Sequence, residues 1–269
     1  MDFSVLMSLY NEEKPGYLEE CLESIMSSSL KPMEIVIVED GPLTNELYEV
    51  LDSYPMCKRV KLSDNVGLGV ALNKGLEFIS TELVARMDTD DVCAVNRFEL
   101  QVKEFEKNQS LILIGSDVAE FDDDVNNILQ IKKMPRTGRE IKKYSEKRNP
   151  FNHPTVMFKK EAVKKAGYYQ KMPYFEDYYL WLRMIRDYPE ESFKNIDTPL
   201  VLMRTNEALY NRRGGKSYIS KIIYFRYICV IEGLLKIDKA IYSSIASLAI
   251  SILPNQYRRK FYRIVLRRK

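Results

Sequence analysis

The sequence predicts an α/β protein built on a mostly parallel, Rossmann-like sheet. Apolar runs rich in branched residues alternate with amphipathic helical patterns through the first 120 residues, and strands that alternate with helices in this way pair in parallel. Acidic and amide residues follow several of these runs, at the carboxyl edge where such sheets bind ligands. The composition, 45% hydrophobic and 29% charged, is that of a globular chain.

The first half of the chain contains the regular alternation. Predicted strands lie at residues 3–9, 35–38, 59–62, 83–87 and 111–114, and predicted helices at 17–28, 45–53, 67–79 and 97–107. By this pattern, residues 1–120 form one α/β half of the nucleotide-binding type.

The alternation ends after Phe121, where three aspartates begin a polar turn. The remaining elements are an antiparallel edge strand at 128–134, helices at 139–147 and 177–187, and strands at 155–159 and 200–204. Residues 121–215 therefore form a second, mixed half, and the two halves make one domain, 1–215. Beyond Ser217 the pattern is helical to the end, with Pro254 separating two helices, so 216–269 is a helical extension.

Charge is divided unevenly along the chain. Residues 212–269 hold 14 Lys and Arg but only 2 Asp and Glu. The first 211 residues hold 27 Lys and Arg and 36 Asp and Glu. Such a division indicates an anionic partner for the C-terminal part, either a membrane surface or a nucleic acid. The apolar stretch 240–253 spans only 14 residues, fewer than the ~20 that cross a bilayer.

Cysteine usage and the N-terminus indicate the compartment. The four cysteines have no paired spacing, which argues against a disulfide framework or a zinc site. The N-terminus has neither a basic region nor a small-residue cleavage site, so we expect a cytoplasmic protein.

An acidic run follows the strand at 83–87. Asp88, Asp90 and Asp91 are close in sequence, and alternate strand residues point the same way, so Asp88 and Asp90 can face one pocket. Mg²⁺ and similar ions are held by one or two carboxylates together with substrate phosphates. The alternative is an acidic turn that caps the helix beginning near Val95.

Other polar residues follow the neighbouring strands. Ser8 to Glu12 end the first strand, and Asp40 ends the second. Asp40 either bonds a ribose hydroxyl or a uracil-like imide, or forms an Asx turn at Gly41. Asn65 and Gly67, before the third helix, are either ligand contacts or loop residues.

Together and in this order, these motifs resemble the pattern of glycosyltransferase family 2, and bacterial enzymes that build surface polysaccharides look most similar. The matching segments are 8–12, 38–41, 65–75, 85–91, 153–158 and 175–178, so the resemblance covers about residues 3–205. It implies a GT-A type fold, a nucleotide-sugar donor, inversion at the anomeric carbon and a divalent metal, Mn²⁺ or Mg²⁺. Two features depart from the family: Glu39-Asp40-Gly41-Pro42 replaces the frequent Asp-Asp-Gly-Ser, and the processive Gln-x-x-Arg-Trp motif is absent.

The resemblance also implies roles for individual residues. Asp40 is expected to bind the nucleotide base, Asp88 to lie near the ribose, Asp90 to hold the metal, and Asp177 to be the catalytic base. Further residues expected on the nucleotide-sugar side are Ser8, Tyr10, Asn11, Glu12, Asn65, Gly67, Asn73, Arg86 and Arg204. Those expected on the acceptor side are His153, Glu176 and Trp181.

Several of these roles have ordinary alternatives. Glu176 and Asp177 begin a helix, where acidic residues also complement the helix dipole. Trp181 has the helical spacing of a core residue. Arg204 and the run 212–215 form either a loop that closes on the diphosphate or a solvated basic turn. His153, the only histidine, is either packed or at the acceptor cleft.

The expected function is therefore transfer of a sugar, with inversion, from a UDP-linked donor to a hydroxyl of a polyprenyl-diphosphate-linked saccharide. Seven cations between Arg258 and Lys269 flank apolar residues, and such a helix either lies on an anionic membrane or packs against the protein. We expect the first, on the inner face of the cell membrane.

Two other functions compete with this one. A sugar nucleotidyltransferase would carry a Gly-rich loop with Arg and Lys after the first strand, and Tyr10 to Lys14 lack it. A noncatalytic nucleic-acid-binding protein would explain the basic C-terminus with its tyrosines but not the N-terminal motifs, so we expect no nucleic-acid partner.

Overall fold

The computed structural model describes residues 1–205 and 215–252. The predicted basic helix of the tail, the break at Pro254 and Arg212 to Gly214 lie outside the described residues.

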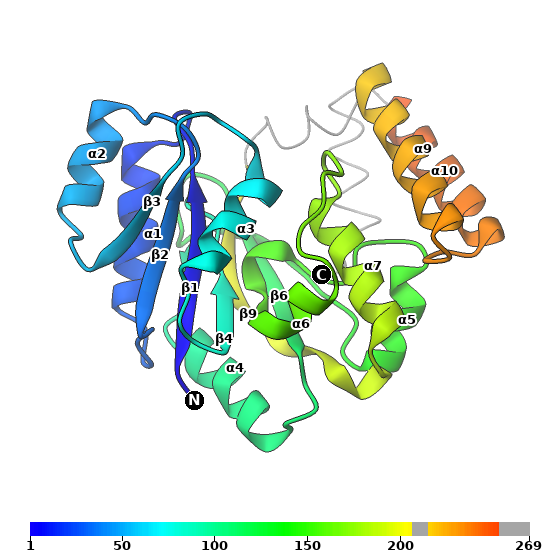
Figure 1. The fold of residues 1–269 in the computed structure, drawn as a ribbon, viewed down its shortest axis with the longest axis horizontal. Helices are drawn as coiled ribbons and strands as arrows, with labels where there is room; N and C mark the ends of the chain where they lie inside the picture. Colours follow the sequence, from blue (N-terminus) through cyan, green and yellow to red (C-terminus); the bar gives the residue numbers. More distant parts are fainter. Residues whose placement is uncertain (206–214, 253–269) are drawn as a thin grey trace.

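The first half confirms the predicted alternation of strands and helices (Figure 1). Its elements are β1 (Phe3–Leu9), α1 (Pro15–Met26), β2 (Glu34–Glu39), α2 (Asn45–Asp52), β3 (Cys57–Lys61), α3 (Leu68–Glu77), β4 (Leu83–Arg86), β5 (Val92–Cys93) and α4 (Arg97–Lys107). β1 pairs in parallel with both β2 and β4, and β2 pairs in parallel with β3. The carboxyl ends of β1, β2 and β4 therefore meet at one edge of the sheet.

The second half is mixed, as predicted. Its elements are β6 (Leu113–Phe121), β7 (Ile128–Lys132), α5 (Gly138–Ser145), the 3₁₀ turn η1 (His153–Thr155), β8 (Met157–Lys159), α6 (Lys160–Lys165), α7 (Glu176–Asp187), the turn η2 (Glu190–Ser192), β9 (Phe193–Arg204), α9 (Gly215–Ile231) and α10 (Ile237–Ile252). The strand order over the described residues is β3-β2-β1-β4-β8-β6-β9-β5, with β7 paired to β6. β8 runs antiparallel between β4 and β6, and β7 is the antiparallel edge strand that the sequence predicts.

Helices cover both faces of the sheet. α1, α2 and α4 pack on one face through a core that includes Leu22, Leu47 and Phe98. α3, α6 and α7 pack on the other face, where Trp181 lies at the centre of a second core. The opposite side of α7 packs against α9 through Tyr178 and Phe225, so α7 joins the sheet to the C-terminal helices.

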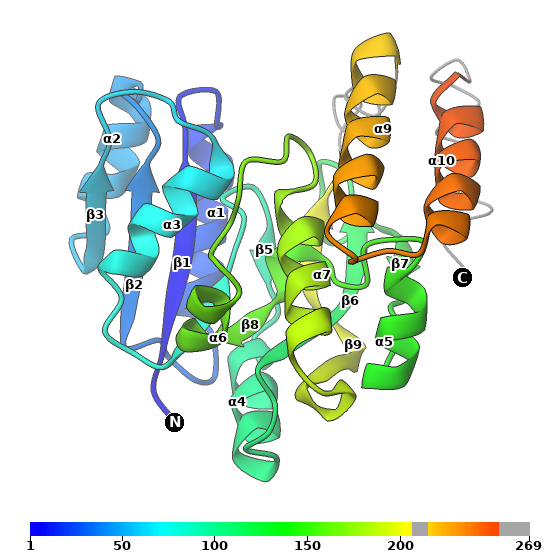
Figure 2. The same ribbon diagram turned by 45° about the vertical axis from the view of Figure 1, so that its right-hand side comes forward.

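α9 and α10 lie side by side at one end of the molecule (Figure 2). The sequence predicts one helix up to Pro254, but the chain turns after α9, where Gly233 has a φ of +68°. That left-handed conformation suits glycine, because a side chain there would be strained. Within 1–205 and 215–252, no helix is both long and apolar enough to cross a membrane.

Candidate active site

Three carboxylates gather where β4 ends. Asp88, Asp90 and Asp91 place carboxylate oxygens within 4.8 Å of one another. Burial, followed by the negative charges of Asp88 and Glu13, raises the pKa of Asp90 to about 7. Burial also raises the pKa of Asp91 well above its usual range, and its Oδ2 atom is buried with no hydrogen-bond partner in the described part of the chain. Because crowded, buried carboxylates are stabilised by a shared cation, this set of oxygen donors fits a divalent metal.

Arg86 lies beneath this carboxylate cluster. Its side chain is 2% exposed and forms an ion pair with Asp88, which holds that carboxylate in place. Against the effect of burial, the charge of Arg86 lowers the pKa of Asp90 and of Asp177. The positive charge of Arg86 therefore influences carboxylates on both sides of the predicted site, Asp90 in the carboxylate cluster and Asp177 on the acceptor side.

Asp40 shapes the loop that follows β3. Its carboxylate accepts hydrogen bonds from the backbone N–H groups of Val66 at 2.7 Å and Gly67 at 3.1 Å. Gly41 has a φ of +90°, and a Cβ there would lie 2.9 Å from the backbone nitrogen of Asn65, so only glycine lets these loops approach. The contact of Asp40 with a nucleotide base stays a prediction.

The residues after β1 lie at the same edge as the carboxylate cluster. Leu6 on β1 is in register with Arg86 on β4, so the loops after the two strands are adjacent. Ser8 is half-buried, whereas the side chains of Tyr10, Asn11, Glu12 and Asn65 are exposed. Their contacts with the donor stay predictions.

The structure corrects three expected ligand contacts. The side-chain amide of Asn73 bonds both backbone groups of Tyr169, at 2.8 and 3.0 Å, so Asn73 fastens α3 to the segment after α6. Arg204 is 6% exposed and donates to the backbone oxygen of Asp90 at 3.1 Å and to Glu20; it supports the acidic turn and is not free to close on a diphosphate. Trp181 is fully buried in the core, so it cannot stack on an acceptor sugar.

Asp177 lies at the start of α7, half-buried and with both carboxylate oxygens in use. Asn149 donates to Oδ2 at 2.6 Å, and the backbone N–H of Tyr178 donates to Oδ1 at 2.7 Å. Burial raises the pKa of Asp177, while these two hydrogen bonds lower it. The carboxylate is thus held in one orientation, as a general base requires.

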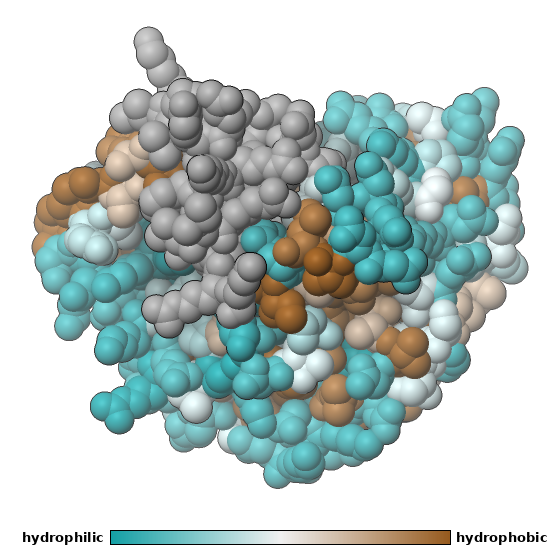
Figure 3. Space-filling view, turned by 180° about the vertical axis from the view of Figure 1, so that it is seen from behind, coloured by the Kyte–Doolittle hydropathy of each residue, from teal (hydrophilic) through white to brown (hydrophobic). Residues whose placement is uncertain are grey.

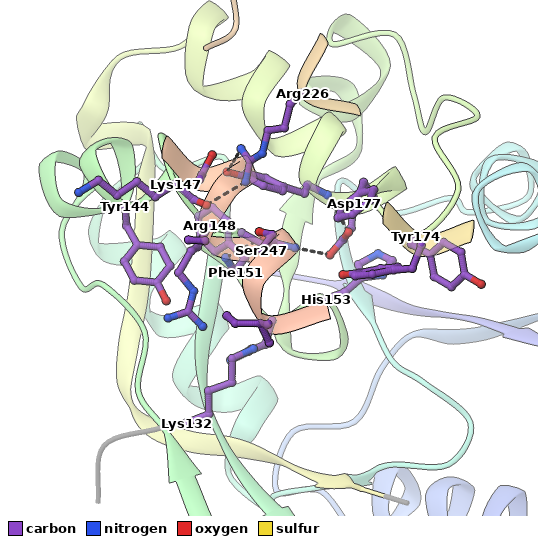
Figure 4. Close-up of a pocket in the computed structure, with 18 of the residues that line it drawn as sticks. Lys132, Tyr144, Lys147, Arg148, Phe151, His153, Tyr174, Asp177, Arg226 and Ser247 are labelled. Atoms are coloured by element: carbon purple, nitrogen blue, oxygen red, sulfur yellow. Dashed lines mark hydrogen bonds between the residues drawn. The ribbon is translucent and has the colours of Figure 1, made fainter. Parts of the chain in front are cut away.

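One cavity of about 600 Å³ is lined by residues from both parts of the predicted site, the carboxylate cluster and the acceptor side. Asp88 lines it from the carboxylate cluster, and His153 and Asp177 line it from the acceptor side (Figure 4). Burial lowers the pKa of His153 well below its usual value, so the ring is neutral, and its Nε2 bonds the Tyr169 hydroxyl at 2.9 Å. Glu176 does not line this cavity, and burial raises its pKa to about 7.

The sequence analysis missed several residues of this site. Asn149, which orients Asp177, and the cavity cations Lys132, Lys147, Arg148 and Arg226 were not identified. The run Lys147-Arg148-Asn149-Pro150 was a usable signal, since it follows a predicted helix in the acceptor half. Asp91 was recognised as acidic but not as a third member of the carboxylate cluster that fits a metal.

Comparisons with known proteins agree with this geometry. Residues 4–167 match the family model "Glycosyl transferase family 2". The amylovoran biosynthesis glycosyltransferase AmsE of Erwinia amylovora is 42% identical over 222 residues, 81% of each chain. The UDP-Gal:alpha-D-GlcNAc-diphosphoundecaprenol beta-1,3-galactosyltransferase of Escherichia coli is 36% identical over 99% of this chain and 97% of its own.

A solved structure supports the fold. The mannosyltransferase PcManGT of Pyrobaculum calidifontis, in complex with GDP-Man and Mn²⁺, superposes with a TM-score of 0.60 at 16% identity, over 95% of this chain and 71% of its own. The chain therefore belongs to glycosyltransferase family 2, and it is a glycosyltransferase with a GT-A type fold.

Proposed function

We propose that this enzyme moves a sugar, with inversion, from a UDP-linked donor to a hydroxyl of a saccharide carried on a polyprenyl diphosphate, during synthesis of a bacterial surface polysaccharide. The donor and acceptor classes are supported by the activity of the E. coli relative, a UDP-Gal:alpha-D-GlcNAc-diphosphoundecaprenol beta-1,3-galactosyltransferase. The observation that carries the proposal is the single cavity that Asp88 and Asp177 both line.

The reaction needs one base. Asp177 removes the proton from the acceptor hydroxyl, the hydroxyl oxygen bonds to the anomeric carbon from one face, and the bond to the UDP oxygen breaks on the other. Asn149 orients the carboxylate for this step. Asp90, with Asp88 and Asp91 beside it, would hold Mn²⁺ or Mg²⁺, which neutralises negative charge on the leaving diphosphate.

We also propose that residues 1–215 form the catalytic domain, in halves 1–120 and 121–215, and that 216–269 attach it to the inner face of the cell membrane. α9 exposes Ile223, Tyr227 and Ile231 at a spacing of four residues, and α10 exposes Ile237, Ile241 and Ile245 in the same way. Contiguous apolar surface of this kind is typical of interaction sites. In Figure 3, hydrophobic residues gather at the upper left, where α9 and α10 lie.

The C-terminal part of the sequence is also rich in cations. Residues 215–252 carry five Lys and Arg against two acidic residues, and 253–269 carry seven cations with no acid. Two copies of such a surface would repel one another, whereas anionic lipid attracts it. Tyrosines in the surface suit the boundary between lipid and water.

The test is transfer from UDP-sugars to lipid-diphosphate-linked saccharides with Mn²⁺ or Mg²⁺. Asp177→Asn should keep UDP affinity, measured by calorimetry, while transfer falls at least ~100-fold, because the isostere keeps shape and loses basicity. If UDP affinity fell as much as turnover, Asp177 would be a binding or folding residue. UDP with Mn²⁺ should also raise the melting temperature more than single-stranded RNA does, and the opposite order would favour the nucleic-acid-binding alternative.

A further inference from the structure

The cavity has a cationic end that the transfer chemistry does not use. Lys147 and Arg148 line it from the segment after α5, Lys132 from β7 and Arg226 from α9. Figure 4 shows Lys147 and Arg148 on one side of the cavity and Asp177 with His153 on the other. Among the described residues that line the cavity, the acidic ones are Asp88 and Asp177.

Three of these cations, Lys147, Arg148 and Arg226, have no acidic partner in the described part of the chain. Arg226 donates to the Tyr178 hydroxyl at 3.2 Å and to the Lys147 backbone oxygen at 2.9 Å. Arg226 is only 7% exposed, and its buried Nε has no partner in the same part of the chain. A buried guanidinium without a counter-charge is costly unless an anion binds beside it.

The position of these cations relates them to the acceptor. Asn149, which bonds Asp177, directly follows Lys147 and Arg148, so the cations are one and two residues from the group that orients the base. The Asp90 cluster, where the donor diphosphate binds, is at the end marked by Asp88. The proposed base, Asp177, and the acceptor sugar that it activates would therefore lie between the donor diphosphate and an anion bound on the Lys147 side.

α10 gives the lipid a path out of the cavity. Tyr242, Ala246 and Ile250, spaced by four residues, line the cavity from α10. Ile237, Ile241 and Ile245 on the adjacent face of the same helix are exposed. A lipid chain that leaves the cationic end of the cavity along α10 would therefore lie directly on this exposed apolar surface.

We propose that Lys147, Arg148 and Arg226 form a subsite for the diphosphate of the lipid-linked acceptor. The subsite fixes the linker of the acceptor while its sugar lies against Asp177. This inference rests on the proposed function, because it assigns a place to the acceptor of that reaction. Guanidinium contacts with phosphate can be bidentate, which gives Arg148 the larger part of the recognition, and Arg226 contributes its positive charge.

Geranyl diphosphate is a probe that needs no knowledge of the acceptor sugar. Titrated by calorimetry into the full-length enzyme, it should bind equally well with and without saturating UDP and Mn²⁺. Lys147→Gln and Arg148→Gln should each weaken the affinity for geranyl diphosphate about tenfold or more, because each removes a charge-assisted contact. The affinity for UDP and Mn²⁺ should stay at the wild-type value. Lys143→Gln, an exposed cation of α5 outside the cavity lining, is the matched control and should change neither affinity.

Three results would overturn the subsite. Displacement of geranyl diphosphate by UDP and Mn²⁺ would assign the cations to the donor diphosphate. Equal affinity in all variants, or no binding to the wild type, would remove any role in diphosphate recognition. The transfer assay on lipid-linked saccharides tests the proposed function independently, so transfer by an enzyme that does not bind geranyl diphosphate would overturn the subsite alone.

Discussion

Asp177 depends on a neighbour that its own sequence motif does not contain. The family-like Glu176-Asp177 pair indicates Asp177 as the proposed base, but Asn149, which donates to it at 2.6 Å, is 28 residues away in the chain. A contact over that distance follows from the fold of the segment after α5 and has no local signal. The sequence thus indicates Asp177 as a candidate base, while the orientation of its carboxylate and the direction of its pKa shift required the structure.

Asn149→Ala should move the acidic limb of the pH profile of kcat to higher pH. Burial raises the pKa of Asp177 and the Asn149 hydrogen bond lowers it, so removing the donor raises the pKa further. A carboxylate is a base only when deprotonated, and turnover therefore begins to fall at a higher pH as the solution is acidified. Asn126→Ala, in the exposed turn before β7, is the control. An acidic limb that stayed in place or moved down would show that Asn149 does not act on the base.

Asp90→Asn should lose most metal-dependent donor hydrolysis, because the leaving diphosphate is then poorly neutralised. Asp88→Ala should instead weaken donor binding more than it changes the metal optimum, since Asp88 is already paired with Arg86. The measurement is hydrolysis of the UDP-sugar over a titration of Mn²⁺. Wild-type activity of Asp90→Asn at every Mn²⁺ concentration would contradict the assignment of this ligand.

The residues that the sequence misplaced share a physical cause. Asn73, Arg204 and Trp181 are types that often bind ligands, but each is saturated or covered by groups distant in sequence. A motif shows which residue types converge at the sheet edge. It does not show which of these side chains already bond to, or are covered by, other parts of the protein.

At the scale of elements, apolar periodicity found the parallel strands and underestimated β6 and β9. The sequence predicts strands at 111–114 and 200–204, whereas β6 continues to Phe121 and β9 begins at Phe193. The C-terminal part of β6 carries the polar residues Ser116, Asp117 and Glu120, all buried, which break the apolar pattern. Other polar groups satisfy them: Arg136 bonds both oxygens of Asp117, at 2.5 and 2.6 Å. β5 and α6 are too short to give a periodic signal.

Arg136→Leu should therefore destabilise the mixed half. It leaves the Asp117 carboxylate, 1% exposed, without its charge partner, and breaking a buried pair from one side is strongly destabilising. Because Arg136 is itself 25% exposed, we expect a loss of about 2 to 4 kcal/mol in the free energy of unfolding, measured in urea. Arg139→Leu, an exposed arginine on α5, should cost much less. Equal losses in the two variants would mean that the Asp117 pair contributes little.

At the scale of the whole molecule, the apolar surface and the cations of the C-terminal part would make different contributions to the proposed membrane binding. Residues 253–269 carry seven cations. Each cation near an anionic surface contributes about 1 kcal/mol of binding free energy, and salt screens that attraction. The exposed isoleucines of α9 and α10 contribute by burial of apolar area, which salt does not screen. The two contributions are therefore separable by ionic strength.

Truncation after Leu253 should abolish the salt-sensitive part of binding to anionic liposomes, while Ile241→Ser with Ile245→Ser should weaken binding at low and high salt alike. Donor hydrolysis should be largely retained in both, because neither change touches the carboxylate cluster. Val95→Ser, an exposed apolar residue before α4, is the matched control and should partition like the wild type. Since the subsite for the acceptor diphosphate opens toward α10, transfer to a lipid-linked acceptor in liposomes should fall further than donor hydrolysis in both variants. Equal partitioning of all four proteins at low salt would contradict membrane attachment through this end of the molecule.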